Sequence, residues 1–133
     1  MTAPEPAMMA VAEKLAGFIA GNGRDLPPDL FAREIVIVEN FAPFIFRAVE
    51  PWAQAMRAHL EDLSDLTHRF GTPIDFSCLG DTAYFSLPTT WSGRNRGVPF
   101  TENGGWALVL KQQAGVWRLA GYGWAVTEVS LIQ

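Results

Sequence analysis

His59 is the side chain in this sequence best suited by type to acid–base chemistry at neutral pH. It belongs to a stripe, spaced by four, three and four residues, that is typical of one face of a helix: Trp52, Met56, His59 and Leu63. Imidazole has an ordinary pKa of about 6.5, so His59 is a candidate acid or base if it faces a cavity. The alternative is that His59 lies at the edge of the helix face, hydrogen-bonded or half-solvated. His68 lies off the stripe and is expected to be solvated.

Other groups with known chemistry point to no further site. Cys78 is the single cysteine, which excludes an intrachain disulfide and a thiolate metal cluster, and its setting, IDFSCLG, favours a small buried strand residue. The two histidines do not share a helical face, so no metal is predicted. GRNRG, residues 93–97, lacks the following helix that would hold a phosphate, and it is expected to be a solvated hairpin tip. No cofactor is expected.

Length and composition indicate one folded domain. The chain has 133 residues, of which 49% are hydrophobic and 18% charged, with a net charge of −4. Scattered basic residues argue against nucleic-acid binding. No signal peptide and no apolar run of about 18 residues is present, so a cytoplasmic protein away from membranes is expected. We predict one domain over residues 1–133, with about the first six frayed.

The first half of the chain predicts helices around one strand. Apolar periodicity indicates a helix over 7–20, ended by Gly21-Asn22-Gly23. Asp25 and the following LPPDLFA suggest a short second helix. EIVIVENF, residues 34–41, predicts a strand with Ile35, Ile37 and Glu39 on one side. A long helix is predicted from Pro51 to Gly71.

The second half predicts antiparallel strands only. Gly80-Asp81, SGRNRG (92–97) and Ala114-Gly115 are turn signals between long β-type segments. Helices followed by a strand meander indicate an α+β fold.

The last segment, AGVWRLAGYGWAVTE, combines large rings with very small residues. Strict alternation puts Gly121 and Gly123 on an inner face with Leu119. The opposite, outer face then carries a predicted dimer interface: Arg118, Tyr122 and Trp124. A bulge at either glycine would reverse this assignment beyond it.

The order of these elements resembles the SnoaL-like branch of the nuclear transport factor 2-like superfamily, with its cystatin-like cone fold. The resemblance rests on ENFAPF, on the GDTAYF hairpin and on the closing WALVLKQQAGVWRLAGYGWA. It implies a strongly curved antiparallel sheet wrapped around helices, a pocket between them, and a homodimer through the outer face of the sheet.

Matching the chain to the ketosteroid isomerase-like enzymes of this fold places Asn40 at the position of the catalytic base. Asn cannot accept a proton near neutral pH. The acid partner falls near Ala107 and the phenol position at Phe18. Glu39 replaces Asn40 only if the register slips and its side chain turns inward. Other members of this branch carry a histidine on the last strand, and Gly123 occupies that position here. None of the recognised catalytic positions therefore holds an acid or a base.

These observations predict a dimeric domain that binds an apolar small molecule without a known reaction. The expected pocket residues are Phe18, Asn40, Phe44, Trp52, Met56, His59, Trp106 and Gly123. One alternative is an isomerase, cyclase or dehydratase that uses His59 for proton transfer on an apolar ring compound. Another is a non-catalytic association module that functions through the outer face of the sheet.

Overall fold

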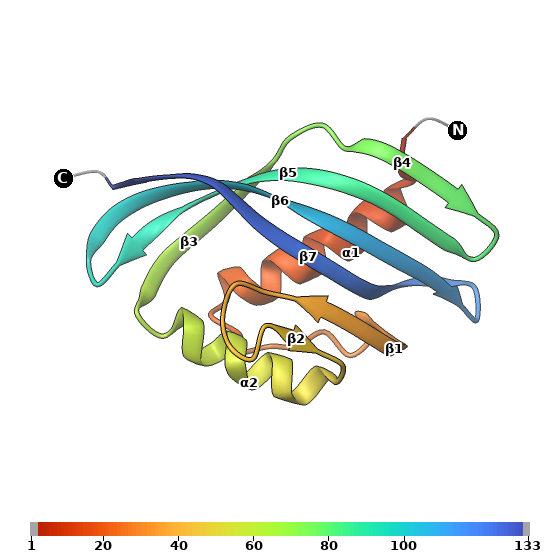
Figure 1. Ribbon diagram of the computed structural model, residues 1–133, viewed down its shortest axis with the longest axis horizontal. Helices are drawn as coiled ribbons and strands as arrows, with labels where there is room; N and C mark the ends of the chain where they lie inside the picture. The colour runs from red at the N-terminus through yellow and green to blue at the C-terminus, as the bar shows by residue number, and fades with distance from the viewer. Residues whose placement is uncertain (1–2, 132–133) are drawn as a thin grey trace.

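The computed structural model describes residues 3–131, which form two helices and seven strands on one curved sheet (Figure 1). In chain order the elements are α1 (Pro6–Ala20), β1 (Phe31–Val38), β2 (Ile45–Phe46), α2 (Val49–Leu60), β3 (Leu63–Phe70), β4 (Ile74–Leu79), β5 (Thr82–Asn95), β6 (Val98–Gln113) and β7 (Val116–Leu131). Both helices lie on the same side of the sheet (Figure 1). The predicted α+β class, with helices packed on a strongly curved sheet, is confirmed.

The sheet has the strand order β2-β1-β7-β6-β5-β3, and β4 pairs with the first part of β5. All neighbouring strands are antiparallel except β1 and β7, which run parallel, so the sheet is mixed rather than purely antiparallel as predicted. The local signals in the sequence describe hairpins. They do not determine the direction of a pair whose members lie at opposite ends of the chain.

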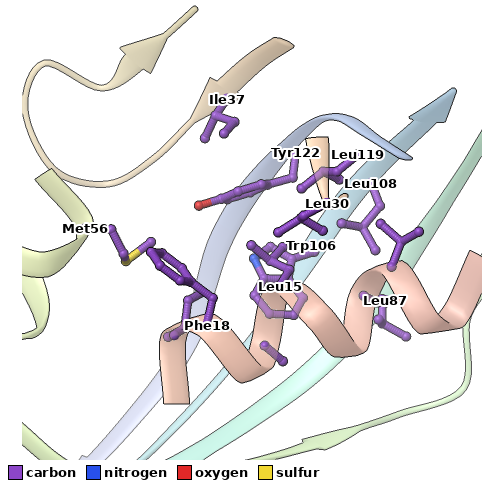
Figure 2. Packing of buried hydrophobic residues seen from close by; sticks show 14 of the residues in the cluster. Leu15, Phe18, Leu30, Ile37, Met56, Leu87, Trp106, Leu108, Leu119 and Tyr122 are labelled. Atoms are coloured by element: carbon purple, nitrogen blue, oxygen red, sulfur yellow. The ribbon is translucent and has the colours of Figure 1, made fainter. Parts of the chain in front are cut away.

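The core lies between the helices and the inner face of the sheet. The predicted apolar face of α1 is buried, with Met8 and Leu15 fully inaccessible. Against it pack the inward rows of the long strands, including Leu87 and Leu108 (Figure 2). This packing fixes the position of the sheet relative to the helices, and so determines which side chains can reach an internal pocket.

The predicted helix from 51 to 70 is wrong in its second half. Helix α2 ends at Leu60, and the chain continues as strand β3. Leu66, His68 and Phe70 alternate on one side of this strand, and His68 lies opposite Trp91 on β5. The stripe through Trp52 and His59 is helical, but beyond Leu60 the helical pattern is overridden by pairing with β5, whose partner residues follow later in the chain.

The short helix predicted after Asp25 is also wrong. Residues 25–30 form an irregular segment with a turn from Pro27 to Leu30. Leu30 is fully buried, and its carbonyl accepts a hydrogen bond from the Leu119 amide. The chain then enters β1 at Phe31, three residues before the predicted start. All three predicted hairpin turns are present: one at Gly80-Asp81, one within 92–97 and one at Ala114-Gly115.

Candidate functional site

Glu39 is a buried carboxylate at the end of the first strand. Strand β1 alternates between buried and exposed residues, with Ile35 and Ile37 inside and Val36 and Val38 outside. Glu39 continues the inward row and is only 7% exposed. The predicted grouping of Ile35, Ile37 and Glu39 on one side is therefore confirmed. Strand geometry places an acid where an apolar residue would otherwise extend the core.

A chain of hydrogen bonds holds this carboxylate. The Tyr122 hydroxyl donates to Glu39 Oε2, and the Trp52 indole N–H donates to the Tyr122 oxygen at 2.9 Å. The backbone N–H of Asn40 donates to Glu39 Oε1 at 3.3 Å. In Figure 2 the Tyr122 hydroxyl oxygen points away from Leu108 and Leu119. The three elements β1, α2 and β7 therefore orient one acid.

Burial raises the pKa of Glu39 from 4.5 to about 7. The hydrogen bonds from Tyr122 and the Asn40 amide oppose this rise, and the nearby charge of Glu102 adds to it. Burial, together with the charge of Glu39, also raises the pKa of Tyr122 well above its ordinary value, so the phenol stays protonated and remains a donor. A carboxyl group with a pKa near neutrality can both accept and return a proton under physiological conditions.

Glu39 lines a pocket between α2 and the sheet. The cavity volume of the pocket is about 70 Å³, and about 530 Å³ of empty space is counted when the open solvent at its mouth is included. Its lining is mainly apolar and aromatic, with four polar side chains at Glu39, Asn40, His59 and Glu102. The other lining residues are Ile19, Met56, Leu60, Leu63, Leu66, Trp91, Phe100, Trp106 and Trp124. Such a combination of apolar walls with a few polar groups is typical of small-molecule sites.

Three tryptophans on neighbouring strands form an aromatic wall, which we call the tryptophan corner: Trp91 on β5, Trp106 on β6 and Trp124 on β7. Trp106 meets Trp91 at 84° and Trp124 at 58°, with ring centroids 6.3 and 5.3 Å apart. Gly104 leaves space for this arrangement, because a Cβ there would lie 2.7 Å from the Trp124 ring. The rings therefore form a corner rather than a flat stack.

Glu102 and His59 are the other titratable groups of the lining. Burial raises the pKa of Glu102, and a hydrogen bond from Trp124 partly opposes the rise. Partial burial lowers the pKa of His59, so the ring is neutral at pH 7. His59 as a whole is exposed to solvent, and its ring stacks on the ring of Phe41, with ring centroids 4.6 Å apart. This combines the two placements considered for His59, since it borders the pocket and is also half-solvated.

The residues predicted for the pocket separate into two groups. The structure places Asn40, Met56, His59 and Trp106 along the lining. The remaining four lie elsewhere: Phe18 and Trp52 pack against each other in the core, Phe44 is 54% exposed, and Gly123 faces outward. Trp52 still contributes, because its indole N–H donates a hydrogen bond to the Tyr122 hydroxyl oxygen.

The predicted faces of the last strand are wrong beyond Leu119. Leu119 pairs with Leu110 and Gly121 pairs with Val109, so Ala120 is an extra residue in the strand. This bulge reverses the alternation, which turns Tyr122 and Trp124 inward and Gly123 outward. Tyr122 is 3% exposed, so it does not belong to an outer dimer face.

Arg118 precedes the bulge, and its guanidinium lies 3.8 Å from the Asp29 carboxylate. Over residues 3–131, no group of three potential metal ligands is found, and no helix is long and apolar enough to cross a membrane.

Sequence reasoning missed four of the lining side chains that matter most: Glu39, Glu102, Trp91 and Trp124. Alternation did place Glu39 on the same side as Ile35 and Ile37, which was a usable signal. Glu102 likewise lies an even number of positions from Trp106 on the same strand. The inward position of Trp124 depends on the bulge at Ala120, and the small residues of this segment did not specify where a bulge would fall.

No protein-family model and no curated protein sequence matches the chain. Solved structures do match it. Hexachlorocyclohexane dehydrochlorinase LinA-type3 from Novosphingobium barchaimii LL02 has a TM-score of 0.77 at 9% identity, over 95% of this chain and 88% of that chain. A ketosteroid isomerase-like protein from Erwinia carotovora atroseptica SCRI1043 has a TM-score of 0.74 at 15% identity, over 92% and 95%. The CaMKII hub of S. rosetta has a TM-score of 0.70 at 15% identity, over 96% and 99%.

At these identities the common property is the arrangement of helices and strands. The match extends over more than nine-tenths of the chain in each case. The chain therefore has the cone fold of the nuclear transport factor 2-like superfamily, as its resemblance to the SnoaL-like branch implied.

Proposed function

We propose that the pocket binds a small, largely apolar molecule and that Glu39 transfers a proton to or from it. The observation that carries this proposal is a single buried carboxyl group with a pKa of about 7, oriented by two donors and open to an aromatic pocket. Each oxygen of Glu39 accepts one hydrogen bond from the protein. Each therefore keeps a lone pair for a substrate proton.

Glu39 suits this role better than the predicted base His59. Two hydrogen bonds fix the Glu39 carboxylate, whereas none of the hydrogen bonds among the described residues involves the His59 ring. A base must be positioned as well as have a suitable pKa. The presence of asparagine at position 40, where the base was expected, does not argue against proton transfer. Glu39, one residue earlier, supplies an inward carboxylate.

The reaction class that fits is removal of a proton from carbon. A C–H bond of the ligand breaks, its proton passes to a Glu39 oxygen, and the acid returns it to the same or another carbon. Two of the compared structures carry the names of a dehydrochlorinase and a ketosteroid isomerase-like protein. These names support a proton-transfer role without identifying the substrate of this chain.

The test is deuterium exchange at carbon. Small cyclic unsaturated ketones, some carrying a trimethylammonium group, are incubated with the protein in D₂O, and exchange is followed by NMR. We expect wild-type protein to accelerate exchange of at least one compound, and Glu39→Gln to lower that rate at least about 100-fold. Glu34→Gln, on the exposed side of the same strand, is the control and should keep the wild-type rate. Exchange that is unaffected by Glu39→Gln, or no exchange of any compound, would contradict the proposal.

A second candidate function is association through the outer face of the sheet. Val38 and Ile45 lie opposite each other there and are 48% and 57% exposed. The same row continues through Gly123 to Ala107, so small and apolar residues follow one another across neighbouring strands. Contiguous exposed apolar surface commonly marks an interface. One compared structure is named as a hub.

If this face is an interface, wild-type protein sediments as a dimer at micromolar concentration. Val38→Lys should then shift it to a monomer, because a buried lysine without a partner opposes association. Val116→Lys is the matched control, since Val116 is comparably exposed but lies at the far end of the β6–β7 hairpin. A monomeric wild-type protein would exclude this candidate.

A further inference from the structure

The pocket lining holds two carboxyl groups and, among the described residues, no lysine or arginine to balance their charge. These carboxyl groups belong to Glu39 and Glu102. The two carboxyl groups interact through space, since the charge of Glu102 disfavours ionisation of Glu39. A site built for a neutral or anionic ligand does not need two acids in this position.

The arginines of the neighbouring elements are engaged elsewhere. Arg57 on α2 donates to the Gly23 carbonyl at 2.6 Å, and neither residue belongs to the pocket lining. Arg94 and Arg96, in the β5–β6 hairpin, lie 3.5 and 3.0 Å from exposed aspartates. The protein therefore supplies no counter-charge to the two pocket carboxylates from these elements.

The tryptophan corner adds a second, independent feature that favours a cation. The face of an indole ring attracts a positive charge, and tryptophan is the strongest of the aromatic residues in this respect. Trp106 and Trp91 are nearly perpendicular, so an ammonium group in their corner would meet aromatic surface from two directions. Trp124 and Glu102 both line the pocket, and the interaction with Trp124 lowers the pKa of Glu102, which places one of the carboxyl groups beside the corner.

We propose that the molecule bound in this pocket carries a positively charged ammonium group, held between the tryptophan corner and the Glu102 carboxylate, with its remaining body against the apolar wall. This inference rests on the proposed function in taking the same pocket as the ligand site. It adds the charge of the ligand, which neither the fold nor the compared proteins specify.

The charge also matches the chemistry proposed for Glu39. Removal of a proton from carbon leaves negative charge on the ligand, and enzymes usually stabilise such charge with donors or cations. The lining offers no lysine or arginine for this purpose. A ligand that carries its own ammonium group close to the reacting carbon would supply the positive charge itself.

The first experiment compares a charged and an uncharged probe of the same shape. Choline and 3,3-dimethylbutan-1-ol differ only in having nitrogen or carbon at the centre of three methyl groups. Binding of each at millimolar concentration is followed by tryptophan fluorescence and by calorimetry. We expect choline to bind at least about tenfold more tightly, which corresponds to one or two cation–π contacts and a nearby carboxylate. Equal affinity, tighter binding of the alcohol, or no detectable binding of choline would overturn the inference.

The second experiment removes one carboxylate. Glu102→Gln preserves size and should reduce the preference for choline at least about fivefold while leaving the affinity for the alcohol nearly unchanged. Glu61→Gln makes the same change of charge at an exposed position after α2 and should leave the preference as in wild type. Circular dichroism checks that both variants are folded. A full preference in Glu102→Gln would remove this carboxylate from the site.

Failure of this inference can be told apart from failure of the proposed function. If Glu39→Gln abolishes deuterium exchange while charged and neutral probes bind alike, Glu39 remains the base and the ammonium preference is wrong. If choline is preferred but no compound exchanges, the pocket is a binding site for cations and the proton-transfer proposal is wrong.

Discussion

Glu39→Gln is expected to become more stable relative to wild type as the pH rises, by about 2–3 kcal/mol between about pH 5 and about pH 8. The quantity compared is the free energy of unfolding of the variant minus that of wild type, measured by urea denaturation at each pH. Few single substitutions of a buried charged residue are expected to stabilise a protein. This one should, because the native state holds the ionised carboxylate at a cost.

The sign follows from the direction of the pKa shift. The pKa of Glu39 rises from 4.5 to about 7 on folding, because burial disfavours the charged form. Between these two pH values the folded protein therefore binds more protons than the unfolded chain, and stability falls as the pH increases. Below about 4.5 the carboxyl is protonated in both states, and the contribution of the protonated acid is fully present. Glutamine remains neutral throughout and has no such dependence.

Glu34→Gln provides the matched control, because Glu34 is exposed on the outer side of the same strand. Its stability difference from wild type should stay within about 0.5 kcal/mol at both pH values. NMR titration of the Glu39 side-chain carboxyl carbon gives the pKa directly. A pKa near 4.5, or a stability difference for Glu39→Gln that does not change with pH, would show that Glu39 is better solvated than its position indicates. The same result would weaken its assignment as the base.

The main features of the fold could be predicted because local sequence patterns indicate them. Alternation in EIVIVENF gave the buried side of β1, and the three turn signals gave the hairpins of the sheet. The helical stripe containing Trp52 and His59 predicted α2 correctly, but it did not indicate that the helix ends at Leu60. Strand β3 could not be predicted in the same way, because Leu63–Phe70 becomes a strand through pairing with β5. Long-range pairing of this kind leaves little trace in the local sequence.

The site was harder to predict than the fold because it depends on one irregularity. Strict alternation carried from Leu119 puts Tyr122 and Trp124 outside, and the extra residue Ala120 puts both inside. The bulge therefore supplies the phenol that orients Glu39 and one ring of the tryptophan corner. Small residues on both sides made a bulge plausible from the sequence, yet they did not say where it would fall. In the correspondence with ketosteroid isomerase-like enzymes, a shift of one residue exchanges Asn40 for Glu39 at the base position.

Gly121→Ala is expected to lower the free energy of unfolding by about 3 kcal/mol, because the backbone of β1 leaves no room for a Cβ atom at this position of β7. A Cβ atom at Gly121 would collide with the backbone carbonyl oxygen of Val36, its partner in the parallel pair. A backbone atom within a sheet cannot rotate aside as a long side chain can, so the strands must separate. Separation of β1 from β7 would also pull Glu39 away from Tyr122, and the pKa of Glu39 should change with it.

Gly123→Ala, two residues along the same strand, is the matched comparison. A Cβ atom at Gly123 meets no atom within 4 Å, and its position on the outer face leaves the pocket unchanged. Its stability should equal that of wild type or exceed it by about 0.5 kcal/mol, because alanine restricts the unfolded chain more than glycine does. Urea denaturation of the two variants, with NMR titration of Glu39 in each, separates the two positions. If Gly121→Ala were as stable as Gly123→Ala and kept the Glu39 pKa of wild type, the close parallel contact between β1 and β7 would not be what positions the carboxylate.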